Sequence, residues 1–402
     1  MPNLPLEDVR VLDLSRVLAG PLCAQYLGDM GADVIKVEDP AGGDDTRKWP
    51  EFVRGPGGAR SSAVFASANR NKRSIALDLK MPAGRDVVHA LAARADVVIE
   101  SFGPGVAARL GVDAGTLRAI NPRLIHCAIS GFGSVGPLRN GKGYDLILQA
   151  FSGMLLLAGE DGGPPTRSAF SPVDQATGLH ALIGILAALY ERRATGRGHS
   201  VEAALFDTSA AFLGYYLHNH WQSGAEPGRV GVGHTGLCPY GLFDTADRPV
   251  IVGVANDVLW GRFCQLTGLD TSAWPTNAQR VQHRAAVEAQ VQAALRQRGR
   301  AHWFAVLDEA GIPCSPLHTL GEFAAHPHTT ASGMVVEVDD PHFGTQKAVA
   351  QPIRLDGQRM PQRRPPPLLG EHTLQILAEL GMAPESISAW IANDVIAPAT
   401  QI

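Results

Sequence analysis

A carboxylate near the start of a long apolar helix is the group in this sequence best placed for chemistry. Asp174 is the third residue of a helix predicted over 172–190, with Ser171 as N-cap and Pro172 at the first helical position. Unpaired backbone N–H groups and the positive end of the helix dipole surround this first turn. We therefore expect Asp174 to be ionised at neutral pH, as a reactive carboxylate or as the cap of its own helix.

Basic side chains follow the ends of several predicted strands. They are Arg16, Lys80, Arg109 and Lys142. Each could be an ordinary solvated charge, whereas four of them on one rim would suit a ligand that carries several phosphates.

The first half of the chain alternates between short apolar strands and helices. Strands are predicted at 9–14, at a segment ending at Glu38, and at 75–79, 95–100 and 124–130, with a helix at 82–94. This alternation indicates an α/β fold with a doubly wound, mostly parallel, Rossmann-like sheet. Ligands of such sheets bind beyond the carboxyl ends of the strands. We therefore expect the site in the segments 15–21, 77–80, 101–105 and 131–145.

The second half of the chain begins with a glycine-rich loop at 224–236. A strand at 249–254 and helical stretches near 256–268, 277–297 and 301–310 follow it, which indicates a smaller α+β domain. A proline run at 365–367 is typical of a stiff spacer. We expect the large domain to comprise 1–223, the small domain 224–330, and the segment 331–402 to return to the large domain and end in a helix.

Composition favours a small-molecule partner. The 402 residues are 45% apolar and carry a net charge of −4, with a pI near 6.4, so no basic field for nucleic acid is present. No lysine-rich run suggests a membrane surface, the apolar run at 181–190 is too short to span a bilayer, and the amino-terminal segment lacks the pattern of a signal peptide. The five scattered cysteines indicate neither disulfides nor a zinc site, so we expect a cytoplasmic protein without metal.

One glycine motif is a misleading signal. GFGSVG at 131–136 matches GxGxxG after a strand, but a dinucleotide site needs a helix to begin within the motif, and Pro137 and Gly141 oppose one. We therefore expect no nicotinamide or flavin site here. His218 and His220 are two apart, which on a helix points them to different faces and does not favour a metal site.

Several segments together resemble the class III CoA-transferase family, of the formyl-CoA transferase and carnitine CoA-transferase type. The likeness covers nearly the whole chain, and its nearest branch is that of the succinyl-CoA:dicarboxylate, glutarate-type transferases. The matching stretches are DLSRVLAGP (13–21), GADVIKVE (31–38), GDDTR (43–47), NRNKRSIALDLK (69–80), ESFGPGVAARLGV (100–112), GYD (143–145), SPVDQATGLHALIGILAALYERRATGRG (171–198) and RPPPLLGEHT (364–373).

The resemblance implies that Asp174 is a nucleophile. It would attack a donor acyl-CoA and pass through a mixed anhydride and an aspartyl-CoA thioester, with CoA as a substrate and no permanently bound cofactor. Arg16 and His234 are our candidates for the distal carboxylate of a dicarboxylic acid. The contacts to CoA that the family implies are Leu18, Ala19, Leu77, Lys80, Ser101, Phe102, Gly103, Arg109, Lys142, Tyr144 and Asp145.

Two departures from the pattern of the family limit the substrates and the reactions that we expect. Leu18 stands where oxalate-using relatives have Gln, and GVGHTG at 231–236 echoes their active-site loop only in part, so oxalate and formate are not expected. Related 2-methylacyl-CoA racemases use a His where this chain has Tyr144, and a Tyr with a pKa near 10 is a poor proton carrier. A racemase and a non-catalytic acyl-CoA-binding protein remain the alternatives. The resemblance also implies an interlocked homodimer.

Overall fold

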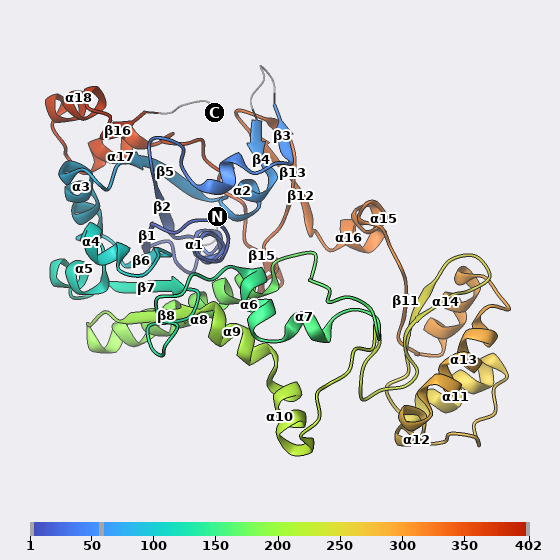
Figure 1. Cartoon of the computed structure of the whole chain (residues 1–402). Helices are drawn as coiled ribbons and strands as arrows, with labels where there is room; N and C mark the ends of the chain where they lie inside the picture. The colour runs from blue at the N-terminus through green and yellow to red at the C-terminus, as the bar shows by residue number, and fades with distance from the viewer. Residues whose placement is uncertain (1–3, 56–59, 399–402) are drawn as a thin grey trace. The chain divides into compact units, whose positions relative to one another are not determined.

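A computed structural model describes residues 4–55 and 60–398 of the chain. The first three residues of the amino-terminal segment and the last four of the predicted segment 331–402 lie outside the described residues. Within these ranges the main sheet has seven strands (Figure 1). They are β1 (Arg10–Asp13), β2 (Asp33–Glu38), β5 (Lys72–Leu77), β6 (Val97–Glu100), β7 (Ile125–Ser130), β8 (Ser200–Ala204) and β16 (Ile396–Ala397).

The order of the strands in this sheet is β16-β5-β2-β1-β6-β7-β8. Every neighbouring pair is parallel except β16 and β5, which are antiparallel. The chain builds outward from β1 in one direction through β2 and β5, then returns and builds in the other through β6, β7 and β8. The prediction of a mostly parallel sheet is confirmed, and the point of reversal lies between β1 and β6, where open α/β sheets bind their ligands.

Side chains of successive residues in a strand point to opposite faces of the sheet, and both faces are covered. Leu12 of β1 belongs to a buried apolar cluster with α3 (Pro82–Ala92), α5 (Ala114–Ile120) and α17 (Thr373–Glu379). On the other face, α1 (Ala19–Asp29) packs against β1 and β2, and α8 (Pro172–Thr195) packs against β7 and β8. The predicted helix at 82–94 and the strand ending at Glu38 are confirmed to within two residues.

Shorter elements connect these layers. The carboxyl-terminal helix α18 (Pro384–Ala392) follows α17 and precedes the edge strand β16. Leu213 separates α9 (Leu205–Phe212) from α10 (Gly214–Ser223). The remaining elements outside the second unit are β3 (Phe52–Arg54), β4 (Arg60–Ser62), the 3-10 helix η1 (Asp45–Lys48), α2 (Ala63–Ala68), α4 (Val106–Leu110), α6 (Asp145–Phe151), α9 (Leu205–Phe212), α16 (Pro327–Ala331), β12 (Val335–Asp340), β13 (Gly344–Val349), β14 (Arg354–Leu355), β15 (Gln358–Arg359) and α18 (Pro384–Ala392).

The chain divides into two compact units. The first combines residues up to Ser152 with Ala169–Leu213 and the chain from His328 onward, and the second combines Gly153–Ser168 with Gly214–Pro327. The main sheet lies in the first unit. The domain boundaries predicted from the sequence, at 223/224 and 330/331, stay a prediction.

The second unit has its own core, built on an antiparallel sheet of order β11-β10-β9. Trp260, Phe263 and Val291 are buried in it. The helical stretch predicted near 277–297 is confirmed as two helices that are separated at His283, and a capping box from Thr276 fixes the start of the first. The elements are α7 (Met154–Leu157), α10 (Gly214–Ser223), β9 (Tyr240–Phe243), β10 (Val250–Gly253), α11 (Asp257–Thr267), α12 (Asn277–Gln282), α13 (Arg284–Leu295), α14 (Arg300–Glu309), β11 (Cys314–Pro316) and α15 (Leu320–Ala325).

The long helix α8 packs closely against α1 because Gly178 has no side chain. A Cβ on Gly178 would lie 2.5 Å from the carbonyl oxygen of Ala19, the first residue of α1. Among the described helices, α8 is the one that is long and apolar enough to cross a membrane by the criteria of length and composition. The core helix of a soluble protein can meet the same criteria, and 44% of the most apolar stretch of α8 is buried. Its contact with α1 sets the spacing between the starts of the two helices.

We predict that Gly178→Ala destabilises the first unit. Alanine favours helices over glycine, but here its Cβ would clash with a backbone oxygen that cannot move without displacing α1, a cost of about 1–3 kcal/mol for overpacking. The free energy of unfolding in urea measures the change. Gly261→Ala in α11 is the matched control, because a Cβ there meets no atom and should stabilise its helix. Equal effects of the two substitutions would contradict the proposed close contact.

Candidate functional site

A cavity of about 580 Å³ opens at the carboxyl ends of β1, β6 and β7 in the first unit. It therefore lies at the point where the strand order reverses. Its walls come from residues 16–20 after β1, 100–105 at the end of β6, 128–134 at the end of β7, 139–144, and the start of α8. The predicted site residues that line it are Arg16, Leu18, Ala19, Ser101, Phe102, Gly103, Lys142, Tyr144 and Asp174.

The start of α1 forms one wall. Leu18 is the N-cap of α1, and no side chain of the described residues caps this end. Gly20 is required here, because a Cβ at this position would collide with the Ser15 side chain. The first N–H groups of α1 therefore lie in the cavity wall without a capping oxygen, which is an arrangement that suits an anion.

Two glycines let the loops after β7 come together. A Cβ on Gly131 would lie 2.6 Å from the backbone nitrogen of Gly143, so the first glycine of GFGSVG allows the 140–144 segment to approach the end of β7. This contact places Lys142 and Tyr144 in the cavity wall. No helix begins within the motif, and the next helix in the chain is α6, which starts at Asp145. The prediction that a dinucleotide-type helix start is absent here is confirmed.

Asp145 caps the helix that carries Asp174. Its Oδ2 accepts hydrogen bonds from the backbone N–H groups of Val173, at 2.8 Å, and Asp174, at 3.2 Å. Ser171 occupies the N-cap position but its side chain does not cap. The alternative in which Asp174 caps its own helix is therefore wrong. The N–H groups of Val173 and Asp174, expected to be unpaired at the helix start, are thus bonded to Asp145.

Asp174 is half-buried in the cavity wall. Burial and the neighbouring Asp145 raise the pKa of Asp174 from 3.8 to about 7. The expectation that Asp174 is fully ionised at neutral pH is therefore wrong, since the helix dipole does not outweigh burial and a second carboxylate that already occupies the helix start. The carboxyl of Asp174 instead titrates near neutral pH.

Glu100 is a second carboxyl in the cavity wall that the sequence analysis did not single out. It is the last residue of β6, is 7% exposed, and accepts a 2.7 Å hydrogen bond from the Phe102 backbone N–H. None of the ion pairs among the residues that the structure describes involves it. Burial raises the pKa of Glu100 to about 7, against the effect of the Phe102 N–H. The sequence signal that could have identified Glu100 is its position as an acidic residue at the carboxyl end of the apolar strand VVIE.

The other predicted site residues do not line this cavity. The Leu77 side chain is buried in the core, Lys80 lies 3.9 Å from Asp39 on the surface, and Arg109 is exposed on α4. Of the four basic residues expected on one rim, the cavity wall contains Arg16 and Lys142. Asp145 acts behind the wall as the cap of α8.

His234 belongs to the second unit. Its Nδ1 accepts a 3.0 Å hydrogen bond from the Gly236 N–H, and its ring stacks at 6.3 Å on Tyr215. The assignment of His234 and Arg16 to a distal carboxylate stays a prediction. Arg16 itself is half-exposed, and its side chain lies 3.5 Å from Asp45.

Comparison with known proteins identifies relatives over nearly the full length. The sequence model of CoA-transferase family III matches residues 6–373. The chain is 39% identical over 388 residues to a succinate–glutarate CoA-transferase of Agrobacterium fabrum, with 94% of this chain and 97% of that protein covered. It is 35% identical over 381 residues to the succinyl-CoA:glutarate CoA-transferase of Homo sapiens, with 94% and 86% covered. A crystal structure of a CAIB/BAIF family protein from Brucella suis matches with a TM-score of 0.83 and 38% identity, covering 94% of this chain and 100% of that chain.

We predict that Asp174→Asn and Glu100→Gln raise the melting temperature more at pH 8 than at pH 5. Both carboxyls have a folded pKa near 7, above the unfolded values of about 4, so the folded state holds protons that the unfolded state releases. Their contribution to stability is fully present below pH 4 and is lost as the pH rises through 7, whereas the amides do not titrate. Calorimetry of each variant and the wild type at both pH values measures the difference.

The matched control is Asp113→Asn, which should lower the melting temperature. Asp113 caps α5, and its hydrogen bonds with Thr116 and Gly115 hold its pKa below the usual value, so its stabilisation is present above the unfolded pKa. A pH-independent effect of the Asp174 and Glu100 substitutions would show that these carboxyls are not held near pKa 7.

Proposed function

This chain belongs to CoA-transferase family III, and from that premise we propose that it transfers CoA from succinyl-CoA to a dicarboxylic acid, with Asp174 as the nucleophile. The family and the glutarate-type branch predicted from the motifs are confirmed by the relatives. The observation that carries the proposed mechanism is the half-buried carboxyl of Asp174 in the wall of a cavity at the carboxyl ends of the sheet.

In the proposed reaction each step exchanges one acyl bond for another. The Asp174 carboxylate attacks the thioester carbon of the donor, the C–S bond breaks, and a mixed anhydride and CoA thiolate form. The thiolate attacks the aspartyl carbonyl carbon, and the anhydride C–O bond breaks to release the donor acid as its carboxylate. The acceptor carboxylate then attacks the carbonyl carbon of the aspartyl-CoA thioester, the C–S bond breaks, and a second mixed anhydride and CoA thiolate form. The thiolate attacks the acceptor's acyl carbon, and the anhydride C–O bond breaks to give the new acyl-CoA and the Asp174 carboxylate.

The environment of Asp174 supports this role. A pKa of about 7 leaves a substantial ionised fraction at neutral pH, and a carboxylate in a partly desolvated wall is less stabilised by water than a surface one. The cavity volume of about 580 Å³ lies within the range usual for small-molecule sites. The uncapped start of α1 and Lys142 provide positive potential of the kind that the phosphates of CoA require.

The finer parts of the proposal follow the sequence predictions. We propose the contacts to CoA that the resemblance implies and the role of Arg16 and His234 toward a distal carboxylate. We also propose that no cofactor is permanently bound and that the protein is cytoplasmic. The partners are an acyl-CoA and a small carboxylic acid, without nucleic acid or membrane.

We also propose a homodimer, interlocked as the family resemblance implies. Apolar side chains on the outer face of α8 support it: Ile183 is 62% exposed and Tyr190 is 79% exposed. Leu179 on the same helix, Phe151 of α6 and Phe212 of α9 are exposed as well. Apolar surface of this kind is typical of a face that another chain covers.

The transfer reaction is tested with Asp174→Asn. We expect wild-type protein incubated with succinyl-CoA to show a CoA-sized mass adduct that hydroxylamine removes. The variant should show no adduct and lose turnover with glutarate by at least about a thousandfold, as loss of a covalent nucleophile does, while still binding CoA. Intact-protein mass spectrometry and steady-state kinetics measure the two quantities.

Asp207→Asn is the matched control for this experiment. Asp207 is the third residue of α9, as Asp174 is of α8, but it is exposed and does not line the cavity, so turnover should be retained. No adduct with any of a panel of acyl-CoA donors would contradict the transferase. Exchange of deuterium at the α-carbon of a 2-methylacyl-CoA would then indicate a racemase, and CoA binding without either activity a binding protein.

The dimer is tested by light scattering after size exclusion. We expect a mass of twice the 42.6 kDa chain that persists on dilution, because an interlocked pair cannot separate without unfolding. Ile183→Glu should reduce the yield of dimer by placing a charge in the buried interface, whereas Leu320→Glu, at an 88% exposed position of the second unit, should not. A stable wild-type monomer near 42.6 kDa would refute the dimer.

A further inference from the structure

We propose that Asp44 is a positioning residue for the acyl-CoA: its carboxylate holds Val17 in a left-handed backbone conformation and so directs the start of α1 into the cavity. This inference rests on the proposed function for the identity of the ligand. Asp44 does not line the cavity, and it acts through the loop between β1 and α1.

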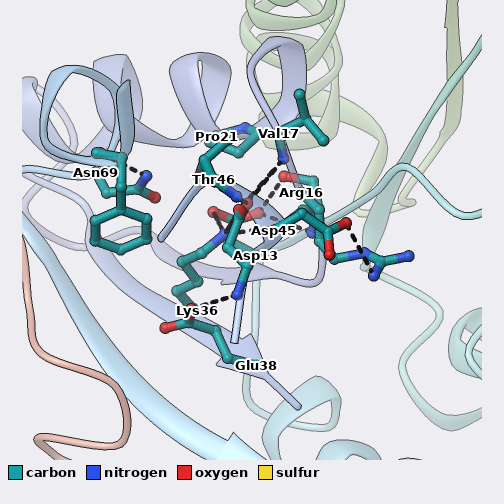
Figure 2. Close-up of polar contacts among 12 residues, drawn as sticks. Asp13, Arg16, Val17, Pro21, Lys36, Glu38, Asp45, Thr46 and Asn69 are labelled. Carbon is teal, nitrogen blue, oxygen red and sulfur yellow. Dashed lines mark hydrogen bonds and ion pairs between the residues drawn. The ribbon is translucent and has the colours of Figure 1, made fainter. Parts of the chain in front are cut away.

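The backbone of this loop is fixed by side chains from three places in the chain. The Ser15 N–H donates to Asp13 Oδ1 at 3.0 Å, and the Arg16 N–H donates to Ser101 Oγ at 3.0 Å. The Val17 N–H donates to both carboxylate oxygens of Asp44, at 3.3 Å each. Figure 2 shows Val17 and Arg16 beside this group of polar contacts. Three consecutive amides are thus held where the chain enters the cavity wall, which begins at Arg16.

Val17 adopts a conformation that its side chain disfavours. Its φ is +72°, in the left-handed region, which is sterically unfavourable for a β-branched residue. Such a conformation persists only where the surroundings enforce it, and the bonds to Asp44 are the contacts made by the Val17 N–H itself. The strained residue immediately precedes Leu18 and Ala19, where α1 begins.

Asp44 is itself fixed and charged. It is fully buried, and its Oδ2 lies 3.0 Å from Nζ of Lys36, which also donates to the Ser15 carbonyl oxygen at 2.9 Å. Its Oδ1 accepts from the N–H and the hydroxyl of Thr46, at 3.0 and 2.8 Å. Although burial opposes ionisation, Lys36 and Thr46 hold the pKa of Asp44 below its usual value. One lysine therefore holds the charge of Asp44 and the carbonyl of the loop together.

The result of this arrangement is the direction of α1. With Val17 in the left-handed region, the chain turns sharply enough for Leu18, Ala19 and Gly20 to line the cavity with the uncapped helix end. If Val17 relaxed to an ordinary conformation, the first turn of α1 would lose this orientation. An anionic group bound there would then lose its hydrogen-bond donors.

The test is Asp44→Asn, measured by kinetics and by hydrogen–deuterium exchange. We expect the KM for succinyl-CoA to rise about tenfold or more, because one or two charge-assisted hydrogen bonds are lost. The change in kcat should be much smaller. Exchange in the peptide spanning residues 14–22 should accelerate in the ligand-free protein. Adding Val17→Gly should recover part of the KM, because glycine adopts the left-handed region without steric cost.

Asp29→Asn is the matched control. Asp29 is the last residue of α1, is 1% exposed, and forms a 2.6 Å ion pair with Arg70, so its substitution breaks a buried pair at the other end of the same helix. It should lower the melting temperature without changing the KM or the exchange of 14–22. An unchanged KM and unchanged exchange in folded Asp44→Asn would overturn the proposal.

Two further outcomes can be distinguished by measurement: a variant that does not fold, and a wild type without transferase activity. If Asp44→Asn does not fold, Thr46→Val removes one hydrogen bond to Asp44 and keeps its charge, and should give a smaller change in the same two quantities. If the wild type transfers no CoA, the proposed function fails. The exchange of residues 14–22 in the ligand-free variants then still decides whether Asp44 fixes the loop.

Discussion

Four charged side chains without access to water lie beneath the cavity, and the geometry of the site depends on their balance. Asp13 of β1 is 2.9 Å from Nζ of Lys72 and 4.0 Å from Nζ of Lys36, and Lys36 is in turn 3.0 Å from Asp44. Two positive and two negative charges thus neutralise each other. Removing one partner from such a group costs about 3–5 kcal/mol, because another charge is left buried and unpaired. The cluster therefore fixes β1, β2, β5 and the segment before η1 as one piece.

The two helices that begin at the cavity differ in the capping of their amino-terminal ends, where the helix dipole is positive. The start of α1 is left without a capping side chain, whereas the start of α8 is occupied by the Asp145 carboxylate. A carboxylate at that end cancels the potential that would otherwise favour an ionised Asp174. The same cap thus stabilises α8 and raises the pKa of Asp174. It leaves α1 as the helix end that can attract an anion.

The sequence predicted the sheet and the segments that line the cavity, because both follow from strong local patterns. Apolar strands alternating with helices define a parallel sheet, and the carboxyl ends of its strands define where Arg16, Ser101 and Lys142 meet. The pKa of Asp174 could not be predicted in this way. It depends first on burial and then on Asp145, which lies 29 residues earlier in the sequence and directly follows the segment in which Gly143 approaches Gly131.

Other differences have the same origin in tertiary contacts. The strand predicted at 75–79 is β5 (Lys72–Leu77), which ends two residues earlier, and the side chain of its last residue, Leu77, is buried in the core. Glu100 was missed because a single acidic residue at a strand end is common, and only burial without a cation distinguishes it. Sequence patterns indicate which segments meet, whereas the charge state of a buried group depends on everything that surrounds it.

The charges in the cavity wall set a condition on how an acyl-CoA can bind. The wall contains the acidic side chains of Asp45, Glu100, Asp174 and Glu202 and the basic side chains of Arg16, Arg139 and Lys142. An anion close to Asp174 or Glu100 would raise their pKa values above 7 and protonate the nucleophile that the proposed reaction needs.

In the proposed function, the phosphates would therefore bind the basic side chains and the start of α1, and the uncharged thioester would lie against Asp174. A site that holds the phosphates firmly at α1 keeps their charge away from the nucleophile, so the orientation of α1 affects the ionisation of Asp174 as well as the affinity for the ligand. This is a physical reason for a strained Val17 to be retained at the start of that helix.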